Sequence, residues 1–133
     1  MSIQVTDTHP LIWYVTNHHT KLSKKALRLF DQSRNGQGLI YVPAAVFWEI
    51  SLLLKSGRIK LHQPFEQWAN SLLAIEGFEI APLDIEIIAE SLCLTFNNDP
   101  FDVAIVATAR IKHLPLITRD DDITNSQVVD IEW

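Results

Sequence analysis

Short apolar segments alternate with helix-forming segments along the whole chain, and this order limits the possible folds more than any other feature. The apolar segments have the length and composition of strands, and the segments between them begin at capping residues and have apolar residues at helical spacing. Strands are expected at 3–7, 38–42, 78–83, 114–118 and 128–133, and helices at 8–16, 24–34, 44–56, 64–77, 85–96 and 99–113. Strands that alternate with helices pair in parallel, so we expect an α/β protein, a three-layer α/β/α domain with a central, mostly parallel sheet.

Length and composition indicate one domain that spans residues 1–133, because the chain has no linker, repeat or low-complexity segment. No segment has the roughly 18 uninterrupted apolar residues of a membrane helix. No signal peptide is recognisable, and the only cysteine, Cys93, excludes an internal disulfide. We therefore expect a cytoplasmic protein with no membrane partner. The net charge of −5 argues against a nonspecific nucleic-acid binder, unless the negative charge is concentrated at a metal site.

One carboxylate lies on the apolar face of an expected helix. In "AAVFWEISLLL", Glu49 shares a face with Val46, Ile50 and Leu53, and no basic residue lies three or four positions away. A core-facing carboxylate without a partner is destabilising. Glu49 therefore calls for an explanation beyond packing.

Three further acids are expected near Glu49, because the carboxyl ends of parallel strands and the starts of the following helices share one edge of the sheet. Asp7 ends the first expected strand, and Asp120 follows the strand at 114–118. Asp102 lies in the first turn of its helix. The sequence thus predicts that four acids from distant segments converge.

Each acid also has a purely structural interpretation. Asp7 could form a turn, Asp102 could interact with the helix dipole, and Asp120 could belong to a solvated acidic loop. Asp99 is explained well as an N-cap before Pro100. Glu49 is the acid that structure alone explains least.

A divalent cation would explain all four acids together. Two carboxylates about 5 Å apart repel each other by roughly 3 kcal/mol at an effective dielectric constant near 20. Mg²⁺ or Mn²⁺, which prefer oxygen ligands, would remove this repulsion, and no Cys/His cluster suggests zinc. Such a site suits hydrolysis of a phosphodiester by an activated water.

Four segments carry a resemblance to a known family. They are "DTHPLIWYV", "VPAAVFWEISLLLKSGRI", "NDPFDVAIVATA" and "LPLITRDDDI", in this order. Together they resemble the PIN domain family, and more narrowly its VapC-type toxin ribonucleases of type II toxin–antitoxin systems. The resemblance covers nearly the whole chain.

The resemblance implies a Mg²⁺- or Mn²⁺-dependent endoribonuclease that cleaves RNA. It assigns both catalysis and metal binding to the quartet Asp7, Glu49, Asp102 and Asp120. Asp99 becomes a supporting acid, and Thr118 matches a position that often carries a hydroxyl near the metal. The resemblance also implies a homodimer and inhibition by a cognate antitoxin protein.

The chain departs from the family pattern at two positions. Val103 stands where many relatives have Arg or Gln, and Asn97 stands where many have His. The loss of a basic residue at Val103 removes a possible phosphate contact, for which Arg119 or Arg110 could compensate. No motif in the sequence decides which RNA would be cut.

Two other functions are compatible with a small parallel α/β fold. A receiver-like signalling domain would need an acid at the end of a central strand and a Lys after a later one. Here, the strand at 38–42 is followed by Pro43, and the strand at 114–118 is followed by Arg119 and Asp120. The second alternative is a catalytically silent PIN-like module that binds RNA or protein, against which the complete acidic set argues.

Overall fold

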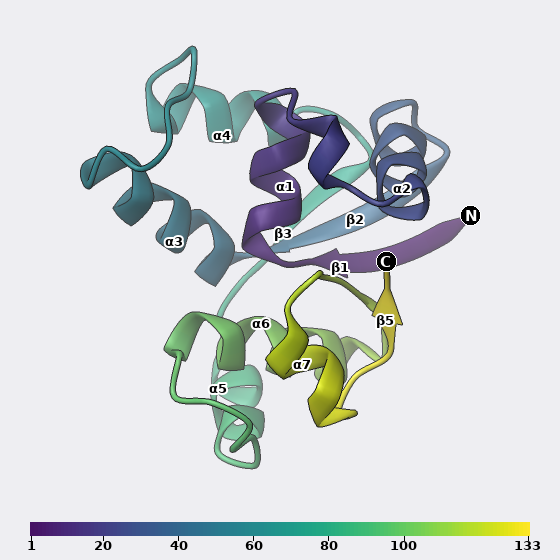
Figure 1. Cartoon of the computed structure of the whole chain (residues 1–133), viewed down its shortest axis with the longest axis vertical. Helices are drawn as coiled ribbons and strands as arrows, with labels where there is room; N and C mark the ends of the chain where they lie inside the picture. Colours follow the sequence, from purple (N-terminus) through teal and green to yellow (C-terminus); the bar gives the residue numbers. More distant parts are fainter.

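The computed structural model describes residues 1–133, which form one sheet of five parallel strands in the order β3-β2-β1-β4-β5 (Figure 1). The strands are β1 (Ser2–Thr6), β2 (Gly38–Pro43), β3 (Phe78–Ala81), β4 (Leu116–Ile117) and β5 (Ile131–Glu132). The helices are α1 (Thr8–Val15), the 3₁₀ turn η1 (His19–Lys21), α2 (Lys24–Arg34), α3 (Ala44–Lys55), α4 (Phe65–Leu73), α5 (Ile85–Ser91), α6 (Pro100–Lys112) and α7 (Asp121–Ser126). This confirms the expected α/β fold with a parallel sheet.

Helices cover both faces of the sheet. Figure 1 shows α1 to α4 on one side of the strands and α5, α6 and α7 on the other. The chain proceeds from β1 to β2 and β3 in one direction and then crosses to β4 and β5 in the other, so right-handed connections place the two sets of helices on opposite faces. β1 and β4 are therefore neighbours at the point where the direction changes, which is where open α/β sheets bind ligands.

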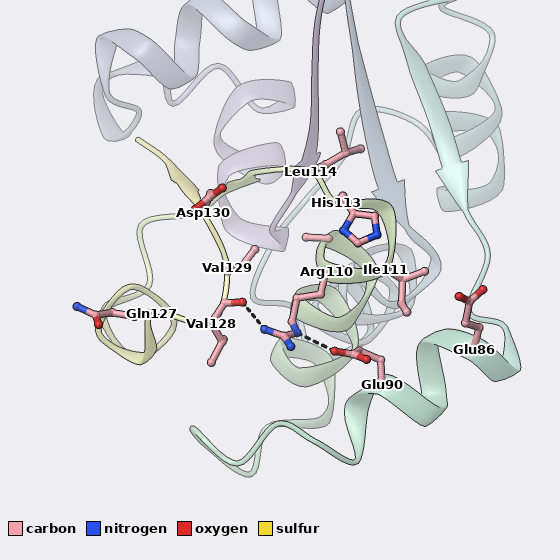
Figure 2. A pocket seen from close by; sticks show the side chains of 11 residues that line it. Glu86, Glu90, Arg110, Ile111, His113, Leu114, Gln127, Val128, Val129 and Asp130 are labelled. Carbon is pink, nitrogen blue, oxygen red and sulfur yellow. Dashed lines mark hydrogen bonds and ion pairs between the residues drawn. The ribbon is translucent and has the colours of Figure 1, made fainter.

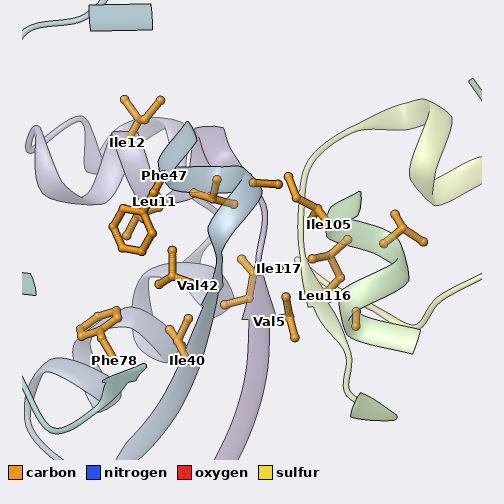
Figure 3. Packing of buried hydrophobic residues seen from close by; sticks show 14 of the residues in the cluster. Val5, Leu11, Ile12, Ile40, Val42, Phe47, Phe78, Ile105, Leu116 and Ile117 are labelled. Atoms are coloured by element: carbon orange, nitrogen blue, oxygen red, sulfur yellow. The ribbon is translucent and has the colours of Figure 1, made fainter. Parts of the chain in front are cut away.

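The central strands are apolar because both of their faces are covered. Val5, Ile40, Val42, Leu116 and Ile117 have no exposed surface. In Figure 3, side chains from α1 and α3 pack on one side of these strands, and side chains from α6 pack on the other. The buried core of the molecule therefore includes β1 and β4, the strands that lead to Asp7 and Asp120.

The structure contains every expected element, with differences at the boundaries. The helix expected at 85–96 ends at Ser91, and the strand expected at 128–133 is only Ile131–Glu132. Helix α7 (Asp121–Ser126) is an additional element, since the sequence indicates only a solvated acidic loop around Asp120. Asp7 is the N-cap of α1, and its side chain accepts a hydrogen bond from Thr8 N. None of the helices is both long and apolar enough to span a bilayer.

Candidate active site

Asp7 lies at the carboxyl end of β1 and is buried, with 7% of its surface exposed. Its Oδ1 accepts a hydrogen bond from Thr8 N at 2.8 Å, and its Oδ2 accepts one from the Thr118 hydroxyl at 2.7 Å. Burial raises the pKa of Asp7 above its usual value, although both hydrogen bonds favour the charged form. Asp7 is thus held in one orientation while remaining short of counter-charge.

Thr118 connects Asp7 to Asp120. The parallel pairing of Thr6 with Ile117 brings the next residue on each strand side by side, and Thr118 is fully buried there. Its Oγ1 donates to Asp7 and accepts a hydrogen bond from Asp120 N at 3.0 Å. The side chain of Asp120 in turn accepts from Ile123 N at 2.9 Å and caps α7. The cap explains why a helix follows Asp120.

Glu49 lies in the second turn of α3 and is half-buried. Burial raises the pKa of Glu49, and the charges of Asp7 and Asp99 raise it further. The Thr8 hydroxyl and His9 lower this pKa. Thr8 Oγ1 itself is buried and has no well-formed hydrogen bond.

Asp102 is the third residue of α6, as predicted, and is also half-buried. Burial is the main cause that raises the pKa of Asp102 to about 7, and the charges of Asp7, Asp99 and Asp120 add to it. The amide of Asn97 donates to Asp102 Oδ2 at 3.0 Å and partly opposes this rise. Asn97, a departure from the family pattern, therefore supports one of the acids.

Asp99 is an exposed N-cap of α6, as its structural interpretation predicted. Its Oδ1 accepts hydrogen bonds from Phe101 N at 2.8 Å and Asp102 N at 3.3 Å. Its charge nevertheless raises the pKa of both Glu49 and Asp102. Asp99 therefore belongs to the same electrostatic cluster without being buried in it.

The four predicted acids thus form one electrostatic cluster at an edge of the sheet, since the charge of Asp7 raises the pKa of both Glu49 and Asp102, and the charge of Asp120 raises the pKa of both Asp7 and Asp102. The chain has two ion pairs, Lys25–Glu132 and Arg110–Glu90, and neither includes a candidate acid. Lys and Arg therefore do not neutralise the cluster.

No three Asp, Glu, His or Cys side chains are arranged as a ready-made set of metal ligands. Three of the acids accept hydrogen bonds within the protein, from the Thr118 hydroxyl, the Asn97 amide and Ile123 N. The donors are all carboxylate and hydroxyl oxygens, and the orphaned Thr8 hydroxyl adds one more. Oxygen donors of this kind are the ligands that a hard divalent cation prefers.

A pocket of about 270 Å³ opens at this edge, and we refer to it as the Trp13 pocket. Its lining consists of Asp7, His9, Pro10, Trp13, Arg119 and Asp120. The sequence did not single out His9 or Trp13 for this region, because nothing in their spacing distinguishes them from ordinary helix residues. Arg119 lies here and can reach a ligand beside the acids.

The largest pocket, of about 530 Å³, lies at the amino ends of β4 and β5, away from the acids (Figure 2). Arg110 crosses it, bonding to Glu90 at 2.8 Å and to the Val128 carbonyl at 2.6 Å. Because both contacts are internal, Arg110 cannot replace the basic residue missing at Val103. We therefore place the chemistry at the smaller pocket, where the unpaired acids are.

Comparison with known families agrees with this geometry. The sequence profile of the PIN domain family matches residues 5–127. The chain belongs to the PIN domain family. No curated protein matches the chain at a significant level.

Solved structures with the same fold cover nearly all of this PIN domain. VapBC2 from Rickettsia felis, bound to a promoter DNA fragment, has a TM-score of 0.70 at 14% identity, over 98% of both chains. DNA-bound VapBC from Salmonella typhimurium has a TM-score of 0.67 at 16% identity, over 99% of this chain and 98% of that one. A toxin–antitoxin complex from Klebsiella pneumoniae has a TM-score of 0.61 at 21% identity, over 95% and 94%. The family match confirms the predicted PIN resemblance and leaves the receiver-like alternative without support.

Proposed function

We propose that this PIN domain is a divalent-metal-dependent endoribonuclease that hydrolyses RNA phosphodiester bonds as the toxin of a toxin–antitoxin pair. The observation that carries the proposal is the cluster of four acids without basic partners at the junction of β1 and β4. We propose that residues 1–133 form one nuclease domain.

Asp7, Glu49, Asp102 and Asp120 are the proposed catalytic residues and the proposed ligands of Mg²⁺ or Mn²⁺. When bound, such an ion polarises phosphate oxygens and lowers the pKa of an attacking water. The cation would also stabilise the charged carboxylates. It would thereby oppose the desolvation and the charge repulsion that raise the pKa of Asp7, Glu49 and Asp102.

Neighbouring residues hold these acids in place. Thr118 fixes the carboxylate of Asp7 through a 2.7 Å hydrogen bond, and Asn97 fixes that of Asp102. Asp99 is a supporting acid that caps α6 and keeps Asp102 at the start of its helix. Such outer contacts orient ligands and typically change metal affinity or activity about 10–100-fold when removed.

The toxin assignment rests on the resemblance of the four motifs and on the fold shared with VapBC and other toxin–antitoxin structures. We propose a cognate antitoxin protein as partner and RNA in the cytoplasm as substrate.

A homodimer is proposed from an apolar surface that α3, β3 and α5 expose. This apolar surface comprises Trp48, Ile80, Leu83, Ile85, Ile88 and Leu92, each 40–84% exposed. Ile85 and Leu92 are the most exposed of these residues, and Trp48, Leu83 and Ile88 also line an apolar groove of about 300 Å³. A large apolar surface of this kind suits a twofold contact with a second copy.

The decisive experiment is cleavage of RNA by the purified protein with and without Mg²⁺ or Mn²⁺, followed by sequencing of the RNA ends. Glu49→Gln should reduce cleavage at least about 100-fold while the circular dichroism spectrum stays unchanged, because the amide keeps the shape and removes the charge. Glu66→Gln, an exposed change in the first turn of α4, is the matched control.

Metal-dependent cleavage that survives Glu49→Gln would exclude the proposed site. A well-folded wild-type protein that binds RNA without cutting it would instead favour the alternative, a catalytically silent PIN-like RNA- or protein-binding module.

A further inference from the structure

The Trp13 pocket combines an aromatic side chain with the acidic cluster. Trp13 lies in the second turn of α1 and its ring is partly exposed. The same pocket contains Asp7 and Asp120, from the ends of β1 and β4. Anything that fills the pocket therefore contacts both the proposed metal site and an indole ring.

Two cations flank this ring. Lys21 Nζ lies 5.8 Å from the centroid of the Trp13 ring, and Arg119 Cζ lies 6.0 Å from it. Both side chains belong to exposed residues, and neither takes part in an ion pair. These distances are at the outer limit of about 6 Å for a cation–π contact, so neither cation is packed tightly against the ring.

The ring is also held from its sides. Its centroid lies 5.9 Å from that of His9 and 6.3 Å from that of Trp133, both at inclined angles. Trp133 comes from the end of the chain beside β5, and η1 carries Lys21. His9, one turn earlier in α1, and Trp133, from the end of the chain, thus both pack against this partly exposed indole ring.

The combination of side chains at the pocket suits a particular kind of ligand. The acids Asp7 and Asp120 line it together with Trp13 and Arg119, and Lys21 lies over the same aromatic ring. A single-stranded nucleic acid presents phosphates and flat bases alternately, and it binds grooves that combine basic side chains with aromatic ones. In a duplex the faces of the bases are already stacked, so the ring would have no partner.

We propose that the Trp13 pocket binds an unpaired nucleotide next to the scissile phosphate of RNA, with its base stacked on Trp13 and its phosphate near Arg119 and Lys21. The inference rests on the proposed nuclease function and extends it, because it assigns to Trp13 the positioning of one unpaired nucleotide beside the acids. Trp13 is then a specificity residue rather than a catalytic one.

The test measures the Kd of a fluorescein-labelled oligouridylate by fluorescence anisotropy, with the same strand paired to oligoadenylate as the duplex probe. Glu49→Gln is the common background, with Ca²⁺ present, so that no RNA is cut. Trp13→Ala should weaken single-strand binding about tenfold and leave duplex binding unchanged, since one stacked base is lost. Trp13→Phe, which keeps a ring, should restore most of the affinity.

Arg119→Gln provides a second variant that touches no core residue. It should weaken binding of both probes and reduce the dependence of Kd on salt by about one phosphate contact. Arg58→Gln, an exposed change after α3, is the matched control and should leave Kd unchanged.

An equal loss for both probes with Trp13→Ala, or no loss with either variant, would overturn the inference. Cleavage of RNA by the wild-type protein with Mg²⁺ is measured in parallel to separate the two proposals. If RNA is cleaved but binding does not depend on Trp13, only the proposal for the Trp13 pocket is wrong. If binding depends on Trp13 but RNA is not cleaved, the pocket is supported and the proposed nuclease function is wrong. If neither binding nor cleavage occurs, both proposals are wrong.

Discussion

Asp7 shows how single residues create this site. It follows the buried end of β1, so its carboxylate enters a region where charge is poorly solvated. Hydrogen bonds from Thr8 N and Thr118 make its charged form tolerable, but burial still outweighs them and keeps its pKa raised. In the metal-free protein near neutral pH, the charged form of Asp7 is thus expected to destabilise the folded state.

The same effect at Asp102 should make the stability of the protein depend on pH. Its pKa is about 7 in the folded protein and 3.8 when unperturbed, so its contribution to stability is complete below about pH 4 and is lost as the pH rises through 7. The difference corresponds to at most about 4 kcal/mol, which solvent screening at this half-buried site reduces to about 1–2 kcal/mol. With EDTA present, Asp102→Asn should therefore be more stable than wild type at pH 8 and equally stable at pH 4.

Urea unfolding at both pH values measures this effect. Asp130→Asn, at an exposed position before β5, is the control and should follow the wild-type protein. If Asp102→Asn were less stable than wild type at pH 8, the interpretation of Asp102 as a repelled carboxylate would be wrong.

At the scale of elements, one glycine permits close packing between α2 and the segment that enters β3. A Cβ atom on Gly77 would lie 1.8 Å from the carbonyl oxygen of Ser33 in the last turn of α2. Because backbone atoms lie on both sides of this contact, the helix or the strand must move. We expect Gly77→Ala to lower the free energy of unfolding by about 3 kcal/mol.

Gly36→Ala is a useful comparison in the same region. A Cβ atom at Gly36 would meet nothing within 4 Å, but its φ of +74° is unfavourable for alanine, so a loss of about 1 kcal/mol is expected. Urea unfolding of the two variants separates steric overlap from backbone strain. Similar losses for both would show that the contact with Ser33 relaxes easily.

The sequence predicted the elements that are governed by local rules. The sequence predicted that four acids lie near one another, because strand ends and helix starts in a parallel sheet share an edge. These acids are Asp7, Glu49, Asp102 and Asp120. The helix at 85–96 was predicted too long because its apolar spacing continues, whereas Leu92 is 84% exposed after the helix ends.

Other features depend on how loops settle against the fold, which spacing does not encode. Asn97 reaches Asp102 only through the bend before α6, and Arg119 reaches Trp13 only through the turn after β4. The two-residue strand β5 exists because β4 offers it a partner. The roles of Asn97 and Arg119 therefore follow from the three-dimensional structure and not from the spacing of residues in the sequence.

At the scale of the whole molecule, the apolar surface predicts an oligomer. If a second copy covers it, Ile85→Glu combined with Leu92→Lys should convert a dimer to a monomer by raising the dimer Kd at least about 100-fold. Both changes suit the ends of α5, since an acid favours the helix start and a base favours the helix end, so the fold should be preserved.

Size-exclusion chromatography with light scattering measures this change. Gln63→Lys combined with Gln67→Glu introduces the same charges at exposed positions outside the apolar surface and should leave the mass unchanged. A monomeric wild-type protein at about 100 µM, far above the Kd of a typical stable dimer, would contradict the proposed homodimer.

The whole molecule should also report the proposed metal through its stability. A cation that binds only the folded state raises Tm, by about 5–10 °C when its concentration is about 100 times Kd. Because the pKa values of Asp7, Glu49 and Asp102 are all raised, protons compete with the cation in weak acid. Mg²⁺ or Mn²⁺ should therefore raise Tm clearly at pH 8 and little at pH 5.

Asp102→Asn should lose most of the rise in Tm at pH 8. NaCl at equal ionic strength should not reproduce the rise, since screening alone does not favour a divalent ion. An equal rise at both pH values, or an equal rise with NaCl, would mean that the acids do not bind the metal, whatever activity the protein has.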